Sequence, residues 1–432
     1  MNKILASLVA LAATALAIVS CGGKSATTHT SGFTYRAFVS NPLFPIGGRN
    51  APVLNIVDAI HDVLSPSDVG LAGNSTQPGL MAVSPNLQYT VVFSLVGNTV
   101  TVVDNTTEGI ASIPNGGGSV PAINLPGYTE SLFIANDNAT AYAAIPTAAI
   151  VGQAPGAIIA MNITSGRITA AIPVAGAHYV VGSPDGSTVL VFSDQSDSIT
   201  VISPIYIGTN ENPVTAVVSG FDRPVWAIFN GATAYIFNCG AECGGTSASV
   251  GTFVAGTSGP GVTVPVKGAT YGVLSGNTLY VAGTPPGSRC SLGSGACGVL
   301  TTIDTQSMTV SHAPLLITDG YHDRMQISGD GQLFVGARAC TNTNTTTGVP
   351  GCLSIYDTTN GSVTLPTTPG DVTGIQPIAG RTVVYVCQGG TFEIFDTTTD
   401  QILVQTTPTQ IVGQSYDVKL VDPPPSPISP TP

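Results

Sequence analysis

A repeated unit dominates this 432-residue chain: a short β-rich run followed by a turn occurs eight times between residues 33 and 422. Consecutive units open 45 to 51 residues apart, at Met81, Tyr128, Ala177, Arg223, Thr270, Tyr321, Asp371 and Tyr416. That length accommodates four strands of five or six residues with their turns. Because a four-stranded sheet repeated around a ring is the blade of a β-propeller, the spacing predicts an all-β fold with a single β-propeller domain.

Composition supports this interpretation and excludes the helical repeat folds. The chain holds 51 Gly and 32 Pro and only 8% charged residues, so it is poor in helix formers and rich in turn formers. Its hydrophobic fraction of 43% excludes wholesale disorder. The net charge of −12 argues against a surface that neutralises phosphates, so no nucleic-acid partner is expected.

The two ends of the repeat region predict how the ring closes. Residues 33–77 supply only the last three strands of a blade, and residues 415–422 supply a lone first strand. Pairing the two removes both free strand edges and gives eight four-stranded blades. The apolar residues between Val53 and Leu64 also fit a helical stripe, and a helix there would leave seven blades.

The first 25 residues predict export and lipid anchoring. Lys3 precedes an apolar run from Ile4 to Val19, which suits a signal peptide better than a membrane span. The following Ser20-Cys21-Gly22 resembles the lipobox of bacterial lipoproteins, with an ordinary cleaved signal as the alternative. The expected organisation is therefore a signal peptide (1–20), a lipidated Cys21 with a flexible tether (21–32), the propeller (33–422) and a Pro-rich disordered tail (423–432). The lipobox implies a bacterial cell-envelope protein anchored to the membrane by its N-terminal lipid, and Gly22 favours the outer membrane.

The repeats resemble the YVTN-type repeats of bacterial extracytoplasmic propellers. The resemblance is carried by SPDG-like turns such as 183–186, by LYV- and VFS-type strands, and by strand ends such as IYDTTN at 355–360. It implies the propeller fold across residues 33–422. Some related propellers are lactonases or quinoproteins that work at the channel mouth, often with a bound metal. YVTN-type rings usually have seven blades, so an expected count of eight departs from the family pattern.

The cysteines predict local disulfides in an exported protein. Cys239 and Cys243, Cys290 and Cys297, and Cys340 and Cys352 form three close pairs, each between the second and third strands of its blade. Their spacing is unlike that of zinc knuckles, although a metal site remains the alternative. Cys387 follows an apolar run and is expected to be a buried, inert thiol.

A candidate ligand or partner face lies where the second-to-third loops and the residues before each first strand meet at the channel mouth. It gathers ionisable and aromatic residues in a chain that has few: Glu130, His178, Arg223, Tyr321, His322, Asp323 and Arg324. Solvated loop residues are the plainer interpretation of the same set. His178 with Glu130 or Asp323 would make an acid–base pair if the ring brings them together. No cofactor or metal is expected, with a Ca²⁺ or transition metal at the mouth as the alternative.

These features favour a non-enzymatic binding scaffold whose partner is an unknown protein, glycan or envelope component. The sequence contains no G-x-S-x-G, H-E-x-x-H, C-x-x-C-H or G-x-x-x-x-G-K motif. The alternative is a lactonase- or quinoprotein-like enzyme with its site at the channel mouth. Single-stranded nucleic-acid binding is a third option, disfavoured by the negative charge.

Overall fold

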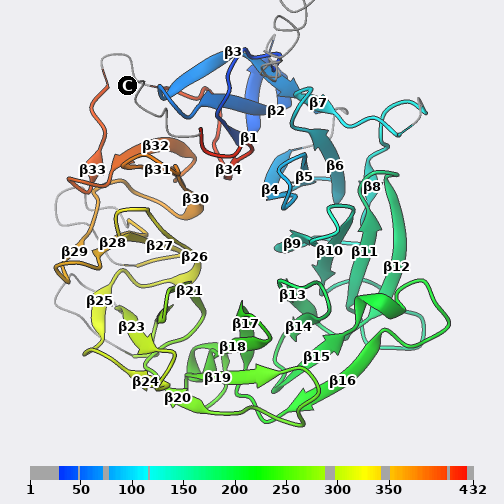
Figure 1. Ribbon diagram of the computed structural model, residues 1–432, viewed down its shortest axis with the longest axis vertical. Helices are drawn as coiled ribbons and strands as arrows, with labels where there is room; N and C mark the ends of the chain where they lie inside the picture. Colours follow the sequence, from blue (N-terminus) through cyan, green and yellow to red (C-terminus); the bar gives the residue numbers. More distant parts are fainter. Residues whose placement is uncertain are drawn as a thin grey trace, which may run out of the picture.

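The computed structural model describes residues 29–46, 49–71, 77–114, 117–287, 297–341, 351–405 and 409–425. Within these residues the chain forms eight antiparallel sheets arranged around a central channel, as Figure 1 shows. The predicted β-propeller with eight blades is thereby confirmed. The predicted signal peptide, Cys21, Cys290 and residues 426–432 lie outside the described residues.

The first four blades follow the chain, each beginning with its innermost strand. Blade 1 is β4 (Pro78–Val83), β5 (Tyr89–Ser94), β6 (Thr99–Asp104) and β7 (Gly109–Ile110), with β8 (Ile123–Asn124) also paired to β6. Blade 2 is β9 (Ser131–Ile134), β10 (Thr140–Ile145), β11 (Ala157–Asn162) and β12 (Arg167–Pro173). Blade 3 is β13 (Ala177–Gly182), β14 (Val189–Ser193), β15 (Ser198–Ile202) and β16 (Val214–Ser219), with the 3-10 turn η1 (Pro204–Tyr206). Blade 4 is β17 (Pro224–Asn230), β18 (Thr233–Asn238), β19 (Ser249–Val254) and β20 (Thr263–Pro265), with η2 (Gly240–Cys243).

The remaining blades complete the ring. Blade 5 is β21 (Tyr271–Ser275), β22 (Thr278–Gly283), β23 (Gly298–Asp304) and β24 (Thr309–Val310), with β25 (Leu315–Ile317) also paired to β23. Blade 6 is β26 (Tyr321–Ile327), β27 (Gln332–Arg338), β28 (Leu353–Asp357) and β29 (Val363–Thr364). Blade 7 is β30 (Val372–Pro377), β31 (Val383–Gln388), β32 (Thr391–Asp396) and β33 (Gln401–Ile402). Blade 8 is β34 (Val418–Leu420), β1 (Arg36–Ile46), β2 (Arg49–Asp58) and β3 (Val63–Gly70).

Blade 8 closes the ring by combining both ends of the propeller. The C-terminal strand β34 pairs antiparallel with β1, with Phe38 opposite Lys419. Figure 1 shows the red β34 lying beside the blue β1. Residues 53–64 contribute to the strands β2 and β3, so the helical alternative, and with it the seven-bladed ring, is wrong.

A buried ion network sits at this closure. The Arg36 guanidinium is fully buried, and it donates hydrogen bonds of 2.7 Å from Nε and Nη2 to the carboxylate of Asp422. Its Nη1 donates to Glu108 Oε1 at 2.6 Å, which connects blade 8 to the β6–β7 turn of blade 1. Glu108 also accepts hydrogen bonds from the backbone N–H and hydroxyl of Ser31. One guanidinium thus joins the N-terminal segment, the C-terminal strand and the first blade.

Packing between blades forms the core. The buried apolar residues of the described chain fall into eight clusters, one for each pair of neighbouring blades. A fully buried phenylalanine occurs at most of these interfaces, as with Phe93, Phe237 and Phe334, and each such side chain contributes about 2–3 kcal/mol through the hydrophobic effect. Trp226, the only tryptophan of the sequence, packs between blades and is only partly buried.

Two of the three predicted disulfides are present, Cys239–Cys243 and Cys340–Cys352. The Cys290–Cys297 pairing involves a residue outside the described chain and stays a prediction. Cys387 is a buried free thiol, as expected.

Aspartates at the ends of third strands form turns. Asp104, Asp304 and Asp357 each accept a hydrogen bond of 2.8 Å from the backbone N–H two residues later. Their recurrence is therefore explained by turn geometry.

Candidate functional site

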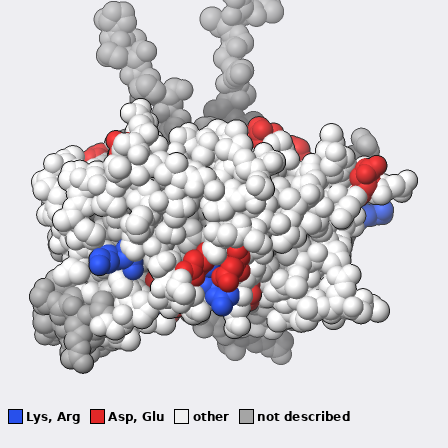
Figure 2. All heavy atoms as spheres, turned by 90° about the horizontal axis from the view of Figure 1, so that it is seen from below, with Lys and Arg blue, Asp and Glu red and all other residues white. Residues whose placement is uncertain are grey.

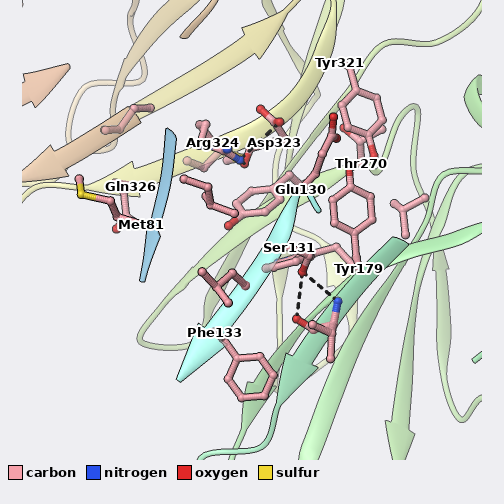
Figure 3. A pocket seen from close by; sticks show the side chains of 18 of the residues that line it. Met81, Glu130, Ser131, Phe133, Tyr179, Thr270, Tyr321, Asp323, Arg324 and Gln326 are labelled. Atoms are coloured by element: carbon pink, nitrogen blue, oxygen red, sulfur yellow. Dashed lines mark hydrogen bonds and ion pairs between the residues drawn. The ribbon is translucent and has the colours of Figure 1, made fainter. Parts of the chain in front are cut away.

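The innermost strands enclose a channel whose cavity of about 190 Å³ is lined from several blades. Figure 3 shows its wall, with Tyr179, Glu130, Tyr321, Asp323 and Arg324 around the opening. A second cavity of about 340 Å³ lies at the mouth. The two cavities have four lining residues in common: Glu130, Tyr179, Val225 and Tyr321. They are therefore two parts of one site, called here the channel cavity and the mouth cavity.

A histidine between two carboxylates forms one wall of the mouth cavity. His178, in β13, places Nδ1 2.6 Å from Asp194 Oδ1 and Nε2 3.4 Å from Glu130 Oε2. Glu130 immediately precedes β9, and Asp194 immediately follows β14, so both lie at strand ends beside the imidazole. The predicted pairing of His178 with Glu130 is present.

An arginine carries this charge network across the channel. Arg338 ends β27 in blade 6, and its guanidinium lies 3.1 Å from Glu130 Oε2 in blade 2. Blades 2 and 6 are four apart in a ring of eight, so the pair spans the channel. Arg338 Nε also lies 2.7 Å from Asp323 Oδ2, at an angle that makes this contact an ion pair and not a hydrogen bond. Tyr179 of blade 3 and Tyr321 of blade 6 pack in one cluster and line both cavities.

These contacts shift the protonation equilibria of the site. Hydrogen bonds to Asp194 and Glu130 outweigh the opposing effect of burial and raise the pKa of His178 to about 9. The hydrogen bond with His178, supported by Arg338, lowers the pKa of Glu130 to about 2. Burial raises the pKa of Asp323, and the adjacent guanidiniums of Arg324 and Arg338 oppose this effect. At neutral pH His178 is thus a cation that donates hydrogen bonds, and it cannot serve as a general base.

Aromatic rings form the wall that faces this charge network. Tyr179, Trp226 and Tyr271 come from the innermost strands of blades 3, 4 and 5 and all line the channel cavity. Trp226 stacks on Tyr271 with ring centroids 5.1 Å apart, and it meets Tyr179 edge-on at 5.9 Å. On the other side, Tyr179 stacks on His178 at 4.3 Å.

The structure brings together six of the seven residues expected at the face. Glu130, His178, Arg223 and Tyr321 line the mouth cavity, while Asp323 and Arg324 line the channel cavity. The disulfide loop contributes Cys243 to the mouth cavity, on the face where the cysteine loops were expected.

His322 is the exception. Its side chain is completely buried, and its Nε2 lies 3.1 Å from the carbonyl oxygen of Thr318. Burial lowers the pKa of His322 to about 4, so the ring is neutral and packed inside the protein. It has no access to a ligand at the mouth.

Sequence reasoning missed four residues of the site: Asp194, Arg338, Tyr179 and Tyr271. Arg338 and Asp194 lie at the ends of second strands. The residues predicted for this face came from the segments around the starts of first strands. The position of Arg338 two residues before Cys340, at the start of a predicted disulfide loop, was the available signal.

Among the described residues, no group of three or more His, Cys, Asp or Glu side chains is arranged to hold a metal ion. The same residues include no helix long and apolar enough to cross a membrane.

Comparison with known proteins shows the fold. No family model and no curated protein sequence matches the chain. Dihydro-heme d1 dehydrogenase NirN in complex with DHE is similar over 90% of this chain and 75% of its own, with a TM-score of 0.61 and 11% identity. The Dos1 propeller is similar over 79% and 86%, with a TM-score of 0.54 and 11% identity. A periplasmic gluconolactonase of Pseudomonas aeruginosa covers 89% and 98%, at 13% identity and a TM-score of 0.46. At 11% identity, the first two similarities bear on the architecture alone.

Proposed function

We propose that this chain is a lipid-anchored, extracytoplasmic β-propeller that binds a ligand or partner at its channel mouth without catalysing a reaction. The observation that carries the binding role is the cross-channel network of Glu130, His178, Asp323 and Arg338, placed beside two cavities that share lining residues. Convergent polar groups in a concave, partly apolar site are the usual mark of a binding pocket.

Charge distribution supports the same location. Four of the cationic side chains line the two cavities, Arg223, Arg324, Arg338 and Lys419, although only 8% of the chain is charged. Figure 2 shows how few charged side chains the rim of the ring presents in that view. A chain that places its scarce charges in its channel presents its recognition chemistry there.

Binding is better supported than acid–base catalysis. The imidazole of His178 is protonated at neutral pH and held between two carboxylates, so it lacks the free lone pair that a general base requires. The lactonase- or quinoprotein-like alternative is tested by assaying lactone hydrolysis and by measuring the metal content of the purified chain.

The binding proposal is tested with the mature chain immobilised and exposed to separated envelope fractions of polysaccharide, peptidoglycan and protein. We expect one fraction to be retained by the wild-type chain and lost by the Glu130→Gln/Arg338→Met variant, which removes the cross-channel pair. Equal retention by both proteins would place recognition elsewhere on the molecule.

Anchoring is tested separately, because Cys21→Ala should abolish lipid labelling and membrane fractionation in a bacterial host.

A further inference from the structure

The two walls of the channel cavity differ in chemistry. The wall from blades 3 to 5 presents the rings of Tyr179, Trp226 and Tyr271, an apolar surface with hydroxyl groups at its edges. The wall from blades 2 and 6 presents Glu130, Asp323 and Arg324. In Figure 3 the labelled Tyr179 and Tyr321 rings and the charged Glu130, Asp323 and Arg324 converge on the same space. A ligand here must present an apolar face to one wall and hydrogen-bonding groups to the other.

The charges of the site are already compensated within the protein. Arg338 pairs with Glu130 and Asp323, and Arg324 lies 3.4 Å from Asp323. Of the outlying cations, Lys419 lies 2.8 Å from Asp417, and Arg223 lies 3.6 Å from Asp197. An ionic ligand would lose its hydration and would have to break one of these pairs to gain a partner. The site therefore favours a ligand without net charge.

Three buried polar atoms on residues that line the two cavities have no hydrogen-bond partner in the described structure. One is an acceptor, Asp323 Oδ1, in a side chain that is only 7% exposed and lines the channel cavity. The other two are donors, Arg223 Nε and Arg338 Nε, in side chains that line the mouth cavity, and Arg338 Nε has only its ion pair with Asp323 Oδ2. A buried polar atom left unpaired costs about 1–3 kcal/mol, which a ligand that pairs with it recovers. A ligand with hydroxyl groups matches both kinds of atom, because each hydroxyl donates one hydrogen bond and accepts others.

Resting on the function proposed above, we propose that the ligand is a neutral saccharide. Its apolar C–H face would lie against Trp226 and Tyr271. One hydroxyl would donate to Asp323 Oδ1, and hydroxyls nearer the mouth would accept from the Arg223 and Arg338 guanidiniums. The mouth cavity, which shares Glu130, Tyr179 and Tyr321 with the channel cavity, gives room for further sugar units.

The chain carries its own reporter for this proposal, because Trp226 is its single tryptophan and lines the channel cavity. We would titrate the purified mature chain with three probe sets while recording tryptophan emission: neutral di- to tetrasaccharides, uronic-acid oligosaccharides, and free amino acids. At least one neutral saccharide should give a saturable change in emission. Asp323→Asn should weaken its binding by about tenfold, since the saccharide hydroxyl would then donate to a neutral amide oxygen in place of a carboxylate.

Two further variants serve as a control and as an independent test. Asp185→Asn, at the exposed β13–β14 turn, is the matched carboxylate control and should bind like the wild type. Trp226→Leu, measured by calorimetry, removes the stacking surface independently of Asp323 and should also weaken binding; the melting temperature of each variant confirms its fold.

The possible failures are distinguishable. Saturable binding of only the uronic acids or only the amino acids, sensitive to Asp323→Asn, would overturn the saccharide and leave the binding function standing. No saturable change with any neutral saccharide likewise overturns the saccharide. If, in addition, the envelope fractions bind equally well to the Glu130→Gln/Arg338→Met variant, the proposed function fails as well.

Discussion

Replacing Arg36 with methionine should destabilise the whole propeller, because this side chain joins the two ends of the ring. Methionine preserves much of the apolar volume of the arginine stem but cannot donate to Asp422 or Glu108. The side chains of these carboxylates are only 9% and 1% exposed, so the substitution leaves two buried negative charges without their common cation.

The magnitude follows from that burial. Removing one partner of a buried ion pair typically costs 3–5 kcal/mol, because the remaining charge stays desolvated. We therefore expect the free energy of unfolding to fall by about 3–5 kcal/mol for Arg36→Met, measured by urea denaturation at neutral pH. Arg167→Met, at an exposed position of β12, is the matched control and should change stability by less than about 0.5 kcal/mol.

A rescue variant separates charge from packing. Adding Glu108→Gln and Asp422→Asn to Arg36→Met removes the uncompensated charges and should restore a large part of the lost stability. If Arg36→Met is no less stable than Arg167→Met, the network does not hold the ring closed. If the triple variant is less stable than Arg36→Met alone, the loss was due to packing and the electrostatic reasoning is refuted.

Three further changes test other parts of the structure. The folded-state pKa of His178 is raised from 6.5 to about 9, which corresponds to a contribution to stability of about 3 kcal/mol. This contribution should be complete below pH 6.5 and lost as the pH rises through 9. Urea denaturation at pH 6 and pH 9.5 should therefore show a larger loss in the wild type than in His178→Gln, and parallel losses would contradict this. Deleting residues 415–432 removes β34 and exposes the edge of β1. The truncated protein should lose more stability than Arg36→Met and should self-associate on size-exclusion chromatography. An unchanged melting temperature would show that blade 8 does not need its C-terminal strand. Replacing Cys340 and Cys352 by alanine should lower the free energy of unfolding by about 3 kcal/mol, as the loop-entropy relation gives for the loop that this disulfide closes. Replacing Cys239 and Cys243, which close a shorter loop, should lower it by about 2 kcal/mol. Equal losses in urea denaturation would argue against that relation for this protein.

The fold was largely predictable because the blades of a propeller repeat at a nearly constant spacing in the sequence. Four strands and their turns need nearly the same number of residues in every blade, so the repeat spacing gives the blade count directly. The missing first strand at the N-terminal end and the extra strand at 415–422 predicted a composite blade, since either edge alone would be left unpaired. The stretch at 53–64 was ambiguous because its dense apolar residues fit both periodicities, and only its pairing with β1 decides between them.

The site was less predictable because it depends on a local change in strand register and on contacts across the ring, and the alternation of residues along a strand indicates neither. The pairing of β26 with β27 shifts register between His322 and Arg324, which is a β-bulge. In a regular strand neighbouring side chains face opposite sides, yet Asp323 and Arg324 both line the channel cavity. The same region buries His322. The Arg338–Glu130 pair joins residues 208 positions apart in the sequence, and only closure of the ring brings them together.

The residues that stabilise the ring differ from the charged residues that line its channel. Eight apolar clusters between blades and the Arg36 network at the closure account for the stability of the ring, and none of them includes the charged residues Glu130, Asp323, Arg324 or Arg338 of the channel. The wall itself carries unpaired buried atoms on Asp323 and Arg223, which destabilise the folded protein when nothing binds them. Other buried atoms of the described chain, such as Thr301 Oγ1 and Gln388 Oε1, also lack a partner, but those of Asp323 and Arg223 belong to residues that line the two cavities, where a bound molecule can pair with them. The channel mouth is therefore the part of this propeller whose chemistry is explained by a ligand and not by the fold.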